Sequence, residues 1–245
     1  MEGKGTIYTQ QIHPNDLKVL ESMTGSRAWD SDIFSKVMVA LAKLKEGNYI
    51  PSTNRPDSVH LQNLMRIMND LLRRTEETKK EHARIILADT QAEKLVAGKL
   101  LIGDENSVTI MEEKQPGREK MQKVIGTMHT HPGGERALVY GLSDGDYKGF
   151  MRDKHHQVML ISYGDLKERY AIMVMKTSVT PNNISPENIK RRIEECNKEF
   201  LKNLEVWDIH KFVNFNKAIC LEFGLTMYLA TPKTRDLFER VNVAV

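Results

Sequence analysis

The stretch Val124-Ile-Gly-Thr-Met-His129-Thr-His131-Pro132 places two histidines two positions apart in an apolar run that ends at a proline. Residues i and i+2 of a β-strand point to the same side of the sheet, so His129 and His131 are expected to present their rings together. Pro132 has no N–H to donate to a neighbouring strand, and we expect it to end this strand close to solvent. The pattern predicts a pair of imidazoles at the rim of a β-sheet.

A hydroxyl and a carboxylate follow in Ser143-Asp-Gly-Asp146. Zn²⁺ in hydrolytic sites is held by three His or Asp/Glu ligands at about 2.0–2.2 Å, which leaves a fourth position for water. His129, His131 and Asp146 form such a set, so we predict that they converge on one Zn²⁺. Either half alone has a structural interpretation, because H-x-H can be two unrelated strand residues and S-x-x-D is also an ordinary helix start. The two halves together, in this order, are more specific.

The combined pattern resembles the signature of the JAMM (MPN+) zinc metalloproteases, which consists of an upstream glutamate, then H-x-H-P, then S-x-x-D. The resemblance covers about residues 57–180 and implies an α/β fold with a mixed β-sheet flanked by helices. It implies that His129, His131 and Asp146 bind the zinc. It also implies that Ser143 donates a hydrogen bond to the oxyanion that forms during hydrolysis.

The loop between the second histidine and the serine is longer here than is common in that family. It contains Gly133, Gly134 and Tyr140, and its glycines leave the backbone conformationally free. We interpret the enlarged loop as a change in substrate contacts, and we expect it to be mobile when no substrate is bound.

The family also has a glutamate that acts as general base on the metal-bound water, at the start of the strand after the first long helix. The run Glu81-His-Ala-Arg-Ile-Ile-Leu-Ala88 keeps the acid, the small third residue and the aliphatic stretch of that strand. It has Arg84 and Ala88 where the family has glycines. Glu93 also precedes an apolar run with glycines and is the alternative. We favour Glu81 over Glu93, because Glu81 matches the register of the family strand and lies directly after a predicted helix.

The composition is that of a folded protein with a nearly balanced surface. With 245 residues, 40% of them hydrophobic, the chain can bury a core, and its net charge of +3 is too small to indicate a nucleic-acid or membrane partner. Cys196 and Cys220 have no C-x-x-C spacing, so neither a zinc knuckle nor a disulfide framework is expected. No apolar run resembles a signal peptide or reaches the roughly 20 residues needed to cross a bilayer, and we expect a cytoplasmic protein.

The chain divides into a predicted N-terminal helical extension (1–56), a zinc-hydrolase core (57–180) and a mainly helical C-terminal extension (181–245). Hydrophobic periodicity and turn residues predict helices over 14–25, 30–47, 58–80, 143–153, 185–204 and 208–223. They predict strands over 84–87, 95–102, 108–111, 124–131, 157–163, 169–177 and 225–230.

The resemblance implies a zinc-dependent peptidase or isopeptidase with a protein substrate. Many members of the family release ubiquitin or ubiquitin-like modifiers, whereas others act on different amides, so deubiquitinase-like activity is an inference from kinship. An oligomer is compatible with the sequence. The alternative is a non-catalytic MPN-type scaffold, which we would expect to have lost ligands. A nucleic-acid binder would use basic patches such as Lys190-Arg-Arg192, but no aromatic-interleaved basic motif accompanies them.

Overall fold

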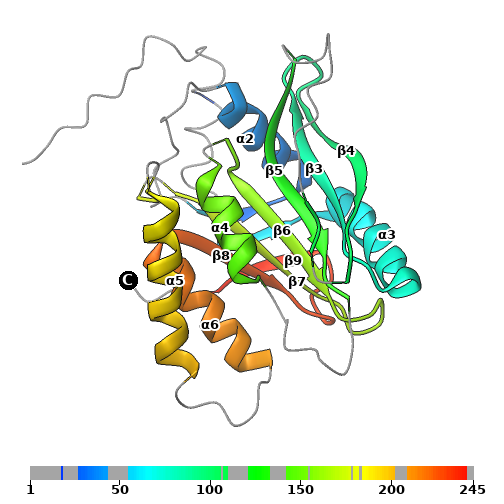
Figure 1. The fold of residues 1–245 in the computed structure, drawn as a ribbon. Helices are drawn as coiled ribbons and strands as arrows, with labels where there is room; N and C mark the ends of the chain where they lie inside the picture. The colour runs from blue at the N-terminus through cyan, green and yellow to red at the C-terminus, as the bar shows by residue number, and fades with distance from the viewer. Residues whose placement is uncertain are drawn as a thin grey trace, which may run out of the picture.

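The computed structural model describes residues 18, 27–43, 55–105, 107–109, 121–132, 142–153, 155–177, 179–181, 184–201 and 209–241. Within these residues the protein has a mixed α/β fold, in which helices cover a single nine-stranded sheet (Figure 1). The strands are β1 (Ala28–Trp29), β2 (Ser58–His60), β3 (His82–Asp89), β4 (Lys94–Ile102), β5 (Gln122–Thr130), β6 (Val158–Tyr163), β7 (Tyr170–Lys176), β8 (Leu225–Ala230) and β9 (Leu237–Arg240). The helices are α2 (Ser31–Lys43), α3 (Gln62–Thr78), α4 (Asp144–Arg152), α5 (Pro186–Leu201) and α6 (Ile209–Glu222).

The strands follow the order β1-β2-β9-β8-β7-β6-β5-β3-β4 across the sheet. The pairs β5–β6 and β1–β2 are parallel, and the other neighbouring strands are antiparallel. The sheet is therefore mixed, as predicted. Strand β5, which carries the two histidines, lies between β3 and β6.

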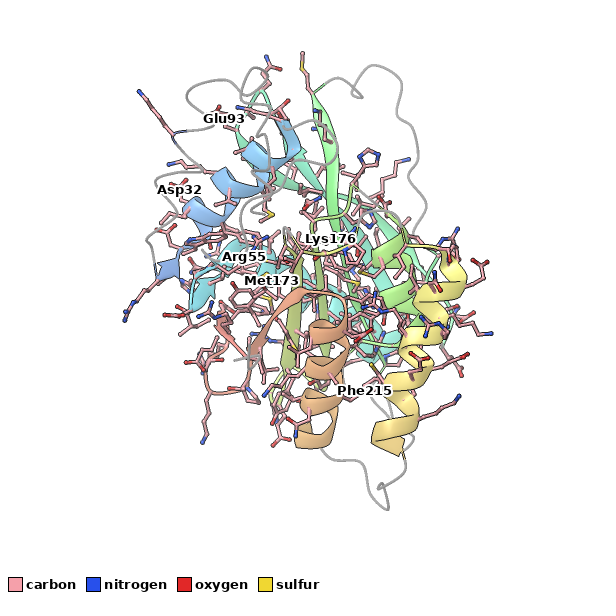
Figure 2. The ribbon with its side chains drawn as sticks, turned by 90° about the vertical axis from the view of Figure 1, so that its left-hand side faces the viewer. Asp32, Arg55, Glu93, Met173, Lys176 and Phe215 are labelled. Atoms are coloured by element: carbon pink, nitrogen blue, oxygen red, sulfur yellow. The ribbon has the colours of Figure 1, made fainter. Side chains whose placement is uncertain are left out.

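Each face of the sheet is covered by its own set of helices. Successive side chains of a strand point to opposite faces, so one strand contributes residues to the hydrophobic core on each side. On β7, Met173 and Met175 point to the core shared with α2 and α3, whereas Ile172 and Val174 point to the core shared with α4, α5 and α6. Figure 2 shows Met173 within the sheet and Phe215 on α6. The helix α4 thus belongs to a different layer from α3.

Most of the predicted elements are present, but the predicted start of the long helix at Ser58 is wrong. Residues Ser58–His60 form β2, and the helix α3 begins at Gln62. Val59 pairs with Phe238 of β9 and with Trp29 of β1. Such long-range pairing overrides a helical period that local sequence suggests.

Two other predicted elements fall partly or mostly outside the described residues. The strand predicted over 108–111 is absent at Val108 and Thr109, which belong to no strand, and its last two residues are outside the described part. The helix predicted over 14–25 lies outside it as well, except for Lys18, which is helical.

The sheet takes strands from both predicted extensions. Strand β1 precedes residue 57, and β8 and β9 follow residue 181, yet β8 pairs along its whole length with β7. The extensions therefore contribute directly to the sheet that carries the histidines. Among the helices of the described residues, none is both long enough and apolar enough to cross a membrane.

Candidate metal and catalytic site

Strand β5 delivers both histidines to one side of the sheet, at its C-terminal end. His129 is paired in register with Ala83 of β3 and Ile161 of β6, and the N–H of His131, one residue past the strand, donates to the carbonyl of Ser162 at 3.2 Å. The two rings have centroids 5.1 Å apart, and both side chains are almost completely buried. Two-residue spacing on a strand thus places the rings side by side, as the sequence predicts.

The first turn of α4 supplies the carboxylate. Ser143 is the N-cap: its Oγ accepts from the N–H of Asp146 at 3.2 Å, and Oδ2 of Asp146 accepts from the N–H of Ser143 at 2.7 Å. The hydroxyl of Ser143 also donates to the same Oδ2, at 2.8 Å. This reciprocal capping box folds the carboxylate back over the helix N-terminus, where negative charge is favoured. The interpretation of S-x-x-D as a helix start is therefore confirmed, and the carboxylate of Asp146 also faces the two histidines.

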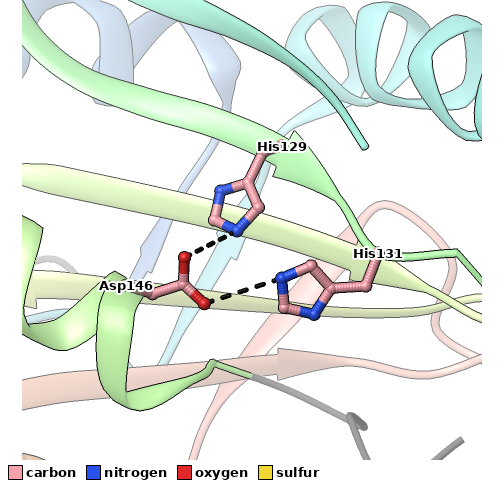
Figure 3. Close-up of side chains that lie close together, drawn as sticks. All are labelled: His129, His131 and Asp146. Carbon is pink, nitrogen blue, oxygen red and sulfur yellow. Dashed lines mark ion pairs between the residues drawn. The ribbon is translucent and has the colours of Figure 1, made fainter. Parts of the chain in front are cut away.

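The three predicted ligands come together. Nε2 of His129 lies 3.0 Å from Oδ1 of Asp146, and Nε2 of His131 lies 3.6 Å from Oδ2 (Figure 3). All three candidate ligand atoms lie within 4.8 Å of one another. Ligands at about 2.0–2.1 Å in a tetrahedron are about 3.4 Å apart, so these separations fit one small divalent cation. Two imidazoles and one carboxylate are also a donor set that suits Zn²⁺.

Glu81 lies beside this cluster, and Glu93 does not. Because β3 runs antiparallel to β5, the residue that precedes β3 lies next to the end of β5. Glu81 is 7% exposed, and its Oε1 is 3.7 Å from Nε2 of His131. Glu93 lies at the periphery (Figure 2), in the turn between β3 and β4 with a φ of 50°, and its carboxylate pairs with Lys43 at 3.0 Å.

The two carboxylates of the site have pKa values shifted in opposite directions. Burial raises the pKa of Glu81 to about 7, and the charges of Asp146 and Asp104 act in the same direction. Burial also tends to raise the pKa of Asp146, but His129 and His131 outweigh it and hold that pKa well below its usual range. Burial lowers the pKa of His129, but Asp146 and Glu81 more than offset this and the net shift is upward. One acid thus stays ionised while the other exchanges a proton near neutral pH.

A buried hydroxyl network fixes β5 between the two histidines. Thr130 points to the opposite face, and its Oγ1 lies 2.5 Å from Oγ1 of Thr75 on α3. The hydroxyl of Thr75 lies 3.1 Å from Nδ1 of His82, and Thr130 donates to the carbonyl of His82 at 3.3 Å. Sequence reasoning missed this network. Its only local signal is Thr75, a polar residue among the buried apolar positions of α3.

The predicted substrate-loop residues Gly133, Gly134 and Tyr140 lie outside the described residues. No protein-family model matches this chain, and no curated protein matches its sequence.

Proposed function

We propose that the protein is a zinc-dependent peptidase or isopeptidase of the JAMM (MPN+) type, and that its mixed sheet with β5 and α4 corresponds to an MPN-type core. The observation that carries the proposal is the convergence of His129, His131 and Asp146 next to a buried glutamate. The two histidines come from the end of β5, Asp146 comes from the N-terminus of α4, and Glu81 directly precedes β3. An ordinary surface cluster of acids would not combine such burial with ligand spacing.

The three ligand residues would hold Zn²⁺ through Nε2 of each histidine and a carboxylate oxygen of Asp146. When bound, the ion supplies Lewis-acid chemistry: it lowers the pKa of a coordinated water toward about 7 and polarises the carbonyl of a substrate. Asp146, whose pKa is held low, remains an anion and so partly offsets the charge of the ion.

Glu81 is the proposed general base. Its carboxylate takes a proton from the attacking water, and the resulting carboxylic acid then gives that proton to the nitrogen of the leaving amine. Burial raises the pKa of Glu81 to about 7 in the metal-free chain, and a divalent cation held by its neighbours would lower it toward the ionised form that a general base needs. Oε1 of Glu81 lies 3.7 Å from Nε2 of His131, beside the group of His129, His131 and Asp146 whose ligand atoms all lie close together.

Ser143 is the proposed donor to the oxyanion. Its hydroxyl already donates to Asp146 at 2.8 Å, so it lies in the immediate surroundings of the ligand set. Rotation of that hydroxyl toward a substrate carbonyl oxygen would stabilise the tetrahedral oxyanion in addition to the cation. Loss of one donor of this kind typically slows turnover by about 10²–10³-fold.

The proposed substrate class is an amide bond in a protein, with ubiquitin-like conjugates as the first choice because of the family resemblance. The test is to incubate the purified, zinc-loaded chain with ubiquitin-like conjugates and with plain peptides, with a chelator and Glu81→Gln as controls. We expect cleavage of at least one substrate that stops with either control. Zinc binding without cleavage of any substrate would favour the non-catalytic scaffold, and failure to bind zinc would overturn the proposal.

A further inference from the structure

A buried asparagine of α6 contacts both sides of the segment that carries Ser143 and Asp146. Oδ1 of Asn216 accepts from the N–H of Leu142 at 3.3 Å and from the hydroxyl of Tyr147 at 2.8 Å. Leu142 directly precedes Ser143, and Tyr147 directly follows Asp146. One side-chain oxygen of Asn216 thus links the residues on either side of the segment 143–146.

The surroundings of Asn216 are apolar, so its polarity needs an explanation. Its side chain is 0% exposed, and its helix neighbours Phe215 and Ile219 belong to the hydrophobic core that α6 shares with α4. Burying an amide is unfavourable unless it is hydrogen-bonded, and an apolar residue would fill the same space without that cost. The two donors that it satisfies are the buried N–H of Leu142 and the buried hydroxyl of Tyr147. The side-chain oxygen of Asn216 therefore accepts two buried donors at the start of α4.

A second amide, from the neighbouring helix, reaches the same turn. Nδ2 of Asn197 on α5 donates to Oδ2 of Asp144 at 3.0 Å, and Asp144 is the first residue of α4. Figure 1 shows α5 and α6 beside α4 on the same side of the sheet. Two helices that lie beyond residue 180 thus hold the helix end that supplies one of the three ligands.

The site needs such support because its ligands come from two separate elements. The histidines belong to the end of β5, whereas Asp146 belongs to α4, so a shift of α4 along the sheet would change the distances from Asp146 to both rings. Metal and catalytic groups work only when they are held to within about 0.5 Å of the productive geometry. A misplacement of about 1 Å can lower the rate by about 10²-fold.

We propose that Asn216 is a positioning residue, which holds the first turn of α4 so that Asp146 and Ser143 meet the two imidazoles; this rests on the proposed function for its catalytic meaning. It gives the C-terminal segment, which lies outside the part that resembles the metalloprotease family, a direct role in the site. Asn197 adds to the same support through Asp144.

The experiment compares Asn216→Ala with Ile219→Val, which alters packing in the same helix but removes no hydrogen-bond acceptor. Asn216→Ser, whose hydroxyl is too short to reach both donors, serves if the alanine variant does not fold. Zinc affinity is measured by competition with a chromophoric chelator, and amide hydrogen exchange over residues 142–147 is measured in the zinc-free protein. Thermal unfolding of each variant provides the comparison of stability.

We expect Asn216→Ala to weaken zinc binding by about 10–100-fold, as is typical for residues that orient ligands, and to speed exchange over 142–147. Ile219→Val should lower the unfolding temperature but leave zinc affinity unchanged. Equal zinc affinity in Asn216→Ala and the wild type would overturn the proposal while leaving the metalloprotease assignment intact. If the wild type binds no zinc, the metalloprotease assignment fails. Faster exchange over 142–147 in Asn216→Ala than in Ile219→Val would then still support the positioning role of Asn216. Equal exchange in the two variants would overturn that role.

Discussion

Nε2 of His129 lies 3.0 Å from Oδ1 of Asp146, although the first residue belongs to a strand and the second to a helix. The two are brought together by the parallel pairing of β5 with β6 and by the packing of α4 above them. This close approach of a nearly buried imidazole and a carboxylate is compatible with two ligands of one cation. It is also the relationship that variants of the site can test most simply.

Asp146→Asn should abolish tight zinc binding. The amide keeps the shape of the side chain and its place in the capping box, but it lacks the negative charge that a divalent cation attracts. We expect affinity to fall by more than the roughly 10–100-fold typical of residues outside the ligand set. Metal content after dialysis, measured by mass spectrometry, tests this, with His60→Ala as the control because His60 is an exposed histidine in β2. Undiminished zinc in Asp146→Asn would show that the ligand set is wrong.

Glu81→Gln should separate metal binding from turnover. The amide cannot accept the proton of the attacking water, so kcat should fall by about 10²–10⁴-fold, whereas zinc content should stay near that of the wild type. Glu93→Gln is the matched control. Glu93 pairs with Lys43 at the surface, so this variant should leave kcat unchanged. A larger loss of activity in Glu93→Gln than in Glu81→Gln would reverse the assignment of the base.

The zinc-free protein should lose stability as the pH rises from about 4.5 to about 7. Glu81 has a pKa of about 7 in the folded chain against an ordinary value of 4.5, so in this window its carboxyl binds more protons in the folded state than in the unfolded state. The free energy of unfolding then decreases with rising pH. Urea unfolding at intervals across the window measures the slope. Glu81→Gln should flatten it, and an unchanged slope in that variant would mean that Glu81 titrates normally.

Thr130→Val should lower both the free energy of unfolding and the affinity for zinc. The substitution keeps the volume but removes the hydroxyl that contacts Thr75 and the carbonyl of His82, so we expect a loss of about 1–3 kcal/mol in the free energy of unfolding. The loosened strand should also bind zinc less tightly, because Thr130 lies between the two histidines. Thr226→Val, at a half-buried position of β8, is the control. Wild-type zinc affinity in Thr130→Val would limit the network to a structural role.

The local features of the site follow from sequence periodicity, whereas its long-range contacts were expected only from the motif resemblance or were not expected at all. The side-by-side placement of His129 and His131 follows from strand alternation, and the helix start at Ser143 follows from its capping pattern. The place of Glu81 beside His131 was expected only from the resemblance, because it depends on the antiparallel pairing of β3 with β5. The strand at Ser58–His60 was not predicted, because it depends on its partners β1 and β9. Neither pairing leaves a periodic signal in the segment itself.

The contacts that brace the site were also beyond local reasoning. Asn216 lies far along the chain from Leu142, and Thr75 from Thr130, so only the packing of α6 on α4 and of α3 on β5 reveals that these side chains meet. Thr75 is flanked by Arg74 and Glu76, and Asn216 is followed by Lys217, so the sequence marks neither residue as buried. Burial and hydrogen-bond geometry give them a meaning that sequence spacing does not.

The most direct measurement is X-ray absorption at the zinc edge on the purified chain after zinc loading and removal of excess metal. We predict one zinc per chain, with two imidazole nitrogens and oxygen ligands at about 2.0–2.2 Å, and loss of the imidazole signal in a double His129→Ala, His131→Ala variant. A chain that retains no zinc with His129, His131, Asp146 and Glu81 all intact, or a coordination shell of sulfur from cysteine, would contradict it.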